Sequence, residues 1–334
     1  MPGTYVESNP EYGWLPFDPS SAQRHNTPLL NENFTPRYLY RLVAPQAGGS
    51  AAAARMSTAI PMNNTDIYHL PTQKGAAQLL NHLLWQQGHQ NGCNLMSWTS
   101  SLLFALQFAL YRHSKDGDDL RQIQLIILDT SCFPPGTFIQ DMEIMRSFQD
   151  ADHRIRKFVE FRESEYYFGE YLTQGRLAIQ GKCVCTSVQR LIDLGLFELQ
   201  PALADREQWQ WWPKRVLEFR EEFLAAKYMP TTDEDVETAV DIAVQCFGGR
   251  WMVPVAIMLL ALQPRRRNDK VIIQRFKAQF SMRDVSRAGL YGMKVDSRRL
   301  PEVGQFKELV EAIQRAYAPS DYDDLVGTVE GLTV

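Results

Sequence analysis

Residues 97–112 read SWTSSLLFALQFALYR, and this stretch decides the fold of the first half of the chain. Its first residues continue an apolar run and predict a short strand over residues 94–98. The remainder repeats apolar residues at helical spacing and predicts a helix over residues 100–113. Thr99, Ser100 and Ser101 at the junction are all acceptable helix N-caps. A strand that runs directly into an apolar helix favours a mixed α+β domain.

The flanking sequence extends this pattern in both directions. QIQLIILDT, residues 122–130, is almost continuously apolar and predicts a strand in the middle of a sheet. Further elements are expected as follows: a strand over 38–45 (YLYRLVAP), a helix over 74–87, a helix or loop and helix over 151–172, two strand-like pieces in 175–188 (GRLAIQGKCVCTSV) joined at 181–182, and a helix that ends near 198.

The chain divides into three parts by composition and periodicity. Residues 1–35 are rich in Pro, Asn, Ser and Tyr and predict an irregular N-terminal arm. Residues 36–200 are expected to form the α+β domain. From residue 201 to 334 nearly every segment has helical period, which predicts an all-helical C-terminal domain. QAGGSAAAARMS, residues 46–57, fits either a loop or a frayed helix start.

Composition excludes several classes of protein. Of 334 residues 45% are hydrophobic and 22% are charged, which is typical of a globular protein. The longest apolar run, residues 251–262, is too short for a membrane span of about 20 residues, so no membrane partner is expected. The net charge of −4 provides no general attraction for nucleic acid. Five cysteines without Cys-x-x-Cys spacing favour an intracellular, cytoplasmic protein with no metal site.

Three features of the α+β region combine into a candidate site. Arg41 lies inside an apolar strand, where an unpaired guanidinium is costly to bury. Ser97 and Thr99 supply hydroxyl groups at a strand end. Glu170 lies in YYFGEYL (166–172), a carboxylate among aromatic rings. Each feature alone has a structural explanation: a paired Arg, a helix cap and an aromatic core.

The order of these features resembles the arginine–serine–glutamate class of mono-ADP-ribosyltransferases, the cholera-toxin-like group. SWTSSLLFALQFALYR is similar to the Ser-x-Ser/Thr strand of that class and the helix that follows it. GEYLTQGRLAIQGKC is similar to its glutamate strand. More broadly, the chain resembles a fungal family related to heat-labile-enterotoxin A chains. The resemblance implies an ADP-ribosyltransferase-like split sheet flanked by helices, with NAD as the substrate and no metal.

The resemblance also implies a role for each residue. Glu170 would bind the ribose hydroxyl and stabilise the oxocarbenium-like transition state. Ser97 would orient Glu170, and Arg41 would hold a pyrophosphate oxygen. The remaining expected cofactor contacts are Thr99, Tyr166, Tyr167 and Tyr171. Two positions depart from the class: Phe168 replaces the Glu or Gln that engages an arginine acceptor, and Trp98 replaces the middle Thr.

The leading functional prediction is an NAD-consuming transferase or, with water as acceptor, a glycohydrolase. The acceptor is left open between protein, RNA, a small molecule and water. One alternative is a biosynthetic transferase with a nucleotide or aminoacyl-tRNA donor, for which residues 265–267 (RRR) would have to bind the RNA. Another is a non-catalytic interaction module. His82 is interpreted as a packed histidine, and Trp209, Trp211 and Trp212 as contacts between the two domains.

Overall fold

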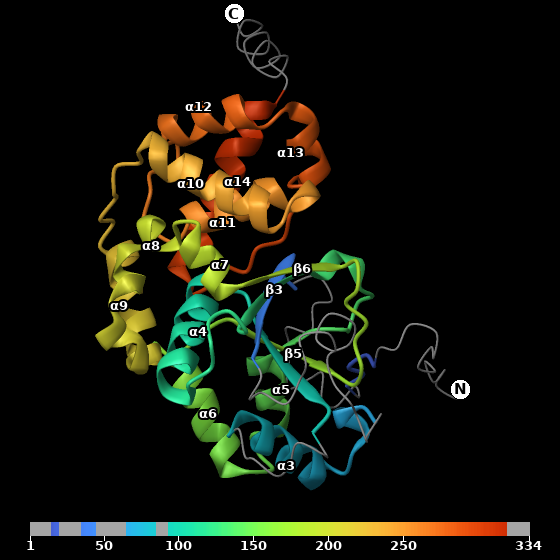
Figure 1. Ribbon diagram of the computed structural model, residues 1–334. Coiled ribbons are helices and arrows are strands. Elements are labelled where there is room, and N and C mark those ends of the chain that lie inside the picture. The colour runs from blue at the N-terminus through green and yellow to red at the C-terminus, as the bar shows by residue number, and fades with distance from the viewer. Residues whose placement is uncertain (1–14, 20–34, 45–64, 85–92, 319–334) are drawn as a thin grey trace, which may run out of the picture.

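The computed structural model describes residues 15–19, 35–44, 65–84 and 93–318. Within these ranges the chain is mixed α+β, with helices around one six-stranded antiparallel sheet, as the sequence predicts (Figure 1). The stretch 46–57 and most of the expected arm over 1–35 lie outside the described ranges. Of that arm, Leu15 forms a bridge to Gln174 at the sheet. No helix in the described ranges combines the length and apolar character needed to cross a bilayer.

The sheet has the strand order β4-β5-β2-β1-β3-β6, and it divides between β2 and β1. These two strands share a single register pair, Tyr40 with Thr99, whereas β1 pairs with β3 at six positions and β2 with β5 at five. The sheet is therefore two three-stranded halves joined at one point. The strands are β1 Tyr38–Val43, β2 Leu95–Thr99, β3 Gln124–Asp129, β4 Ile139–Gln140, β5 Glu170–Gln174 and β6 Cys183–Ser187.

Helices cover the sheet from the side of α4, which follows β2 as predicted. Ser101 caps the N-terminus of α4 by accepting a hydrogen bond from the Phe104 amide at 3.1 Å, and Gly117 ends the helix in the left-handed region at φ 73°. The helices of this part are α3 Thr72–Leu83, α4 Leu102–Asp116, α5 Asp141–Phe148, α6 His153–Glu163, α7 Val188–Asp193 and α8 Leu196–Leu199, with short 3₁₀ turns at Ile67–His69 and Thr130–Cys132.

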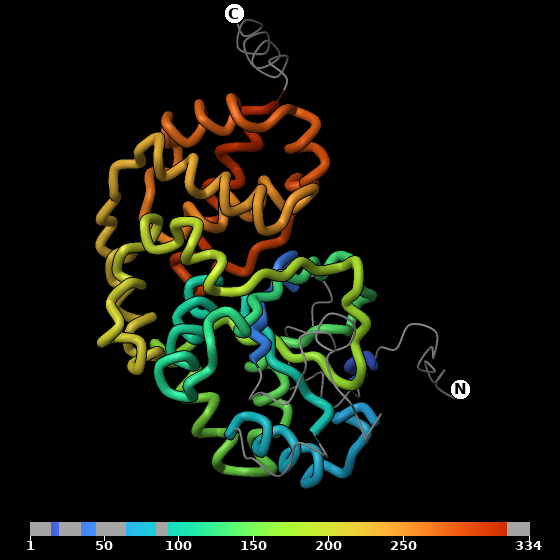
Figure 2. The backbone as a smooth tube through the Cα atoms, in the orientation of Figure 1, coloured from blue at the N-terminus to red at the C-terminus, as the bar shows by residue number. Residues whose placement is uncertain are grey.

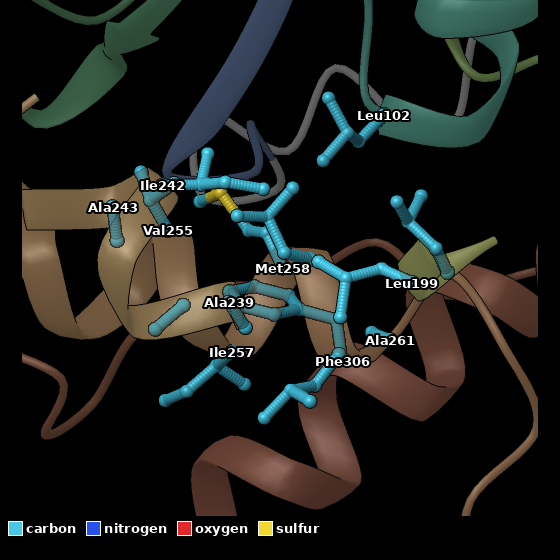
Figure 3. Close-up of a cluster of buried hydrophobic side chains, with 14 of the residues drawn as sticks. Leu102, Leu199, Ala239, Ile242, Ala243, Val255, Ile257, Met258, Ala261 and Phe306 are labelled. Atoms are coloured by element: carbon cyan, nitrogen blue, oxygen red, sulfur yellow. The ribbon is translucent and has the colours of Figure 1, made fainter. Parts of the chain in front are cut away.

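The remaining described chain is helical; its first helix lies beside α4, and the helices after it pack as a lobe above the sheet (Figure 1). It contains α9 Trp212–Leu224, α10 Asp233–Cys246, α11 Met252–Leu260, α12 Lys270–Gln279, α13 Met282–Ala288 and α14 Pro301–Tyr317, with 3₁₀ turns at Pro201–Ala204, Arg206–Trp211 and Gly249–Trp251. One hydrophobic core runs from α4 into this lobe, with Leu102 near Met258 and Phe306 (Figure 3). The boundary near residue 200 stays a prediction, since this core includes residues from both sides of it.

Aromatic rings reinforce the contact between the two parts. The Trp212 ring lies 5.4 Å from the rings of Phe104 and Phe108 on α4. Trp209 is buried and donates to the Leu203 carbonyl at 2.8 Å, whereas Trp211 is more than half exposed. The chain also returns to the sheet between α13 and α14, where the Arg37 amide donates to the Lys294 carbonyl at 2.9 Å (Figure 2).

The structure corrects the expected strand pair in residues 175–188. Only its second piece is a strand, β6, and the other strand, β5, lies before Gly175 rather than after it. Gly175 adopts φ 66°, a left-handed conformation that interrupts the strand. Leu177 and Ile179 are nevertheless buried, in the core cluster that contains Trp98. Their apolar character therefore reflects packing by an irregular segment, and the helix expected within 151–172 ends earlier, at Glu163.

Candidate functional site

Ser97 and Glu170 lie on neighbouring strands, β2 and β5, and Arg41 lies on β1, across the division of the sheet. Glu170 is the register partner of Thr99, and residues two apart on a strand share a face, so Glu170 and Ser97 lie on one face. The Ser97 hydroxyl Oγ donates to Glu170 Oε1 at 2.6 Å. Arg41 Nη1 donates to the main-chain carbonyl of Ser97 at 3.1 Å. Ser97 and Glu170 are therefore joined through their side chains, whereas Arg41 contacts only the main chain of Ser97. Because its neighbour Tyr40 is the register partner of Thr99, strand alternation places Arg41 on the sheet face of Trp98.

Arg162, which the sequence did not indicate, holds the second oxygen of Glu170. Its Nη2 lies 2.7 Å from Glu170 Oε2, and its Nε lies 3.3 Å from the buried carboxylate of Asp141. Its Nη1 donates to the Tyr166 carbonyl at 3.1 Å, which fixes the guanidinium against the loop before β5. Glu170 is therefore bonded on both oxygens, while 18% of its side chain stays exposed.

His82 completes the cluster on the far side of Ser97. Its Nε2 lies 2.9 Å from Ser97 Oγ, and its Nδ1 lies 3.5 Å from Cys93 Sγ. Because the single hydroxyl proton of Ser97 is directed at a carboxylate, Ser97 Oγ must accept from His82 Nε2–H. His82 Nδ1 is then the acceptor that faces the Cys93 thiol. The interpretation of His82 as only a packed histidine missed this role in orienting Ser97.

Burial shifts the pKa of His82, Arg41 and Asp141. Burial lowers the pKa of His82 to about 4, with Glu170 opposing this shift and Arg41 adding to it, so the imidazole is neutral at pH 7. Burial also lowers the pKa of Arg41 to about 10, which leaves it cationic. Burial raises the pKa of Asp141 to about 7, although Arg162 opposes the rise.

Arg41 is the one cation of the cluster without a carboxylate partner among the described residues. It makes the single hydrogen bond to the Ser97 carbonyl, and its guanidinium lies 5.9 Å from the centre of the Trp98 ring. A guanidinium carries five N–H donors. Most of its donors therefore remain for a ligand, and the absence of a bonded acid favours an anionic one.

The other expected cofactor contacts have structural partners instead. Thr99 Oγ1 donates to the Phe168 carbonyl at 2.7 Å and accepts from the Ser101 amide. Tyr171 is buried, lies on the opposite sheet face from Glu170, and donates to Asp296 Oδ2 at 2.9 Å. Tyr167 is also buried, and its hydroxyl accepts from Gln140. The half-buried Tyr166 stacks on Phe161 with ring centres 4.4 Å apart.

Both departures from the transferase class are core residues. Phe168 is buried and stacks on Phe104 with ring centres 4.8 Å apart. Trp98 is buried, and its Nε1 donates to Thr173 Oγ1 at 3.1 Å. Neither ring is available to a substrate from these positions, so packing accounts for both substitutions.

Two further expectations concern ligands other than NAD. Arg265 is buried and paired with Asp235 at 3.0 Å, and the exposed Arg267 pairs with Glu311 at 2.8 Å, so the three arginines of 265–267 do not form one exposed basic patch. Among the described residues no three His, Cys, Asp or Glu side chains gather as metal ligands. Arg41, Ser97 and Glu170 line neither the cavity beside Arg37 nor the small cavity beside Leu103.

Comparison with known proteins gives no match: no family model fits the chain, and no curated protein or solved structure is significantly similar to it.

Proposed function

We propose that this chain is an NAD-consuming enzyme of the mono-ADP-ribosyltransferase kind, acting as a transferase or as a glycohydrolase. The single observation that carries the proposal is the bond from Ser97 Oγ to Glu170, two residues 73 positions apart, with Arg41, 56 positions before Ser97, bonded to the Ser97 main chain. The resemblance implies that these residues lie near one another. Their large separation along the chain makes such proximity informative, since neighbouring residues on one strand are always close. The split between β1 and β2 supports the implied split sheet.

The chemistry follows from the groups present. Arg41 binds a pyrophosphate oxygen of NAD through its unused donors. Glu170 accepts from a hydroxyl of the nicotinamide ribose and stabilises the positive charge that develops there. The C–N bond to nicotinamide breaks and nicotinamide leaves with its electron pair. The acceptor then forms a bond to the same carbon and gives its proton to Glu170. Ser97 and Arg162 hold Glu170 in place throughout.

The acceptor side of the site favours water or a hydroxyl group over an arginine side chain. Phe168 removes the acid that would engage an incoming guanidinium, and its ring faces away from solvent. Arg162 already provides a guanidinium at Glu170 Oε2. A second cation beside it would be repelled, since like charges at close range are unfavourable. We therefore expect hydrolysis of NAD to exceed transfer to arginine analogues.

Nicotinamide release from NAD by the purified full-length protein tests the proposal. We expect turnover by the wild-type chain and a loss of at least about 100-fold in Glu170→Gln, because the neutral amide cannot stabilise the developing charge. Glu165→Gln is the matched control, since Glu165 is an exposed carboxylate in the loop that precedes β5. Absence of nicotinamide release from the wild-type protein, or equal rates in the two variants, would contradict the proposal.

A further inference from the structure

A cavity of about 450 Å³ lies away from Glu170, between the loop after β3 and the loop after α13. Its floor is the loop that follows β3, with Phe133, Thr137 and Phe138, and its roof is the loop after α13, with Tyr291 and Lys294. The volume falls within the range of small-molecule sites, about 300–1,000 Å³. The cavity is thus large enough for a ligand of mononucleotide size.

Arg37 ties the floor of this cavity to its roof. Its amide donates to the Lys294 carbonyl at 2.9 Å, and its own carbonyl accepts from the Thr130 amide at 2.8 Å. Its Nη1 donates to the Gly289 carbonyl. Gly289 adopts φ 60°, and a Cβ at this position would lie 3.2 Å from Arg37 Nη1, so glycine permits this close approach. The walls are therefore held together by specific bonds.

Two cationic side chains line the cavity, in a chain whose net charge is −4. Arg37 and Lys294 line it, and no Asp or Glu is among the described lining residues. Asp129 lies buried behind Arg37 at 3.3 Å and is also approached by Arg250 at 3.7 Å. Lys182 Nζ adds a further cation 4.3 Å from the centre of the Phe133 ring. This balance of charge favours an anionic ligand.

Three aromatic side chains, Phe133, Phe138 and Tyr291, also line this cavity. The rings of Phe133 and Phe138 meet edge to face with centres 5.5 Å apart. Tyr291 in the roof is 59% exposed, although large aromatic side chains are usually buried. Rings of this kind bind planar ligands by stacking. The cavity therefore combines cationic side chains with aromatic rings.

We propose that this cavity binds an aromatic ring system that carries a phosphate or carboxylate group. The site is separate from the proposed NAD site, because Arg41, Ser97 and Glu170 do not line it. Lys294 and Arg37 bind the anionic group, and Tyr291 and Phe133 hold the ring. The proposal does not depend on NAD turnover.

Calorimetric titration of the full-length protein with four probes tests the proposal. AMP represents an aromatic phosphate and 1-naphthoate an aromatic carboxylate, while adenosine and inorganic phosphate each carry one feature alone. We expect at least one aromatic anion to bind at least ten times more tightly than adenosine or phosphate. Lys294→Ala and Tyr291→Ala should each weaken binding of that aromatic anion at least about tenfold. The first removes a contact to the anionic group, and the second removes a contact to the ring.

Controls separate this site from the site at Glu170. Lys277→Ala removes an exposed lysine on α12 and should leave binding unchanged. Glu170→Gln should also leave it unchanged. The proposal is overturned if neither aromatic anion binds, if Lys294→Ala and Tyr291→Ala bind as the wild type does, or if Glu170→Gln abolishes binding. Lys294 and Tyr291 are both exposed, so their variants are expected to fold.

Discussion

The molecule contains two clusters of the same three residue types, Ser–Glu–Arg, and their surroundings differ. In the first, Ser97 Oγ donates to Glu170 at 2.6 Å and Arg162 pairs with the same carboxylate at 2.7 Å. In the second, Ser101 Oγ donates to Glu302 at 2.6 Å and Arg220 pairs with it at 2.8 Å. The bond lengths are nearly identical, so the bonds alone do not distinguish a site from a structural pair.

Exposure and further partners make the distinction. Glu302 and Arg220 are only 4% and 6% exposed, and Arg220 reaches both Glu302 oxygens and the Tyr167 carbonyl. This cluster joins α14 and α9 to the N-terminus of α4. Glu170 is 18% exposed, and Ser97, which donates to it, is also hydrogen-bonded to His82. The comparison indicates that the Glu302 cluster is a buried structural contact, whereas the Glu170 carboxylate stays partly accessible to solvent.

The largest expected effect concerns stability. Glu302→Gln should lower the free energy of unfolding by about 3–5 kcal/mol, because Arg220 remains buried without a carboxylate. Glu170→Gln should lower it by much less, since Arg162 keeps Asp141 as a partner. Urea denaturation of both variants measures the difference. Equal losses of unfolding free energy would show that the two clusters have the same structural role, which contradicts the distinction drawn between them.

Arg162 provides a test of how Glu170 is held. Arg162→Ala should slow nicotinamide release by about 10–100-fold, because Glu170 loses the bond on Oε2 that orients it. The variant should fold, since burial already raises the pKa of Asp141 to about 7 and this carboxyl can become neutral. Methylguanidine added at non-denaturing concentration should restore part of the rate by filling the empty position.

Arg162→Lys is the matched control for that rescue. It keeps the positive charge but cannot bond Asp141 and Glu170 with one planar group, and its side chain leaves no space for methylguanidine. We therefore expect Arg162→Lys to be slow and insensitive to the additive. Rescue of both variants, or of neither, would mean that Arg162 acts on the fold and not on the position of Glu170.

Sequence reasoning predicted the parts of the fold that depend on local pattern. The strands around Arg41 and Ser97, the central strand β3 and the helix α4 follow from apolar periodicity and caps. The two-residue strand β4 and the helices α5 and α13 were not predicted, because these elements are short and their boundaries are set by contacts with other elements.

Some residues of the candidate site could be predicted from the sequence, and others could not. Arg41, Ser97 and Glu170 follow a recognisable order along the chain. Arg162 and His82 do not, because their roles arise only when β2, β5, α3 and α6 pack together. A helix-end arginine or a helical histidine has an ordinary local explanation, so nothing in the sequence distinguishes these two from others of their kind.

The smallest expected effect is the pH dependence that His82 contributes. Burial lowers its pKa to about 4 in the folded chain, against roughly 6.5 when unfolded. Between these values the unfolded chain binds more protons, so this contribution to stability falls as pH falls. We expect protonation of His82 in the unfolded chain to lower the free energy of unfolding by about 1 kcal/mol as the pH falls from 6 to 5.

His82→Gln isolates this contribution from that of Asp141, which has the opposite sign. The folded-state pKa of Asp141 is raised to about 7, so Asp141 gains protons on folding and favours the folded state as pH falls from 7 toward 4. The difference between wild type and His82→Gln, measured by urea denaturation at each pH, cancels the Asp141 contribution. NMR should show the His82 imidazole neutral at pH 5.5. A charged imidazole at that pH would mean that Ser97 is not held by a neutral histidine, and the distinction between the two Ser–Glu–Arg clusters would then rest on exposure alone.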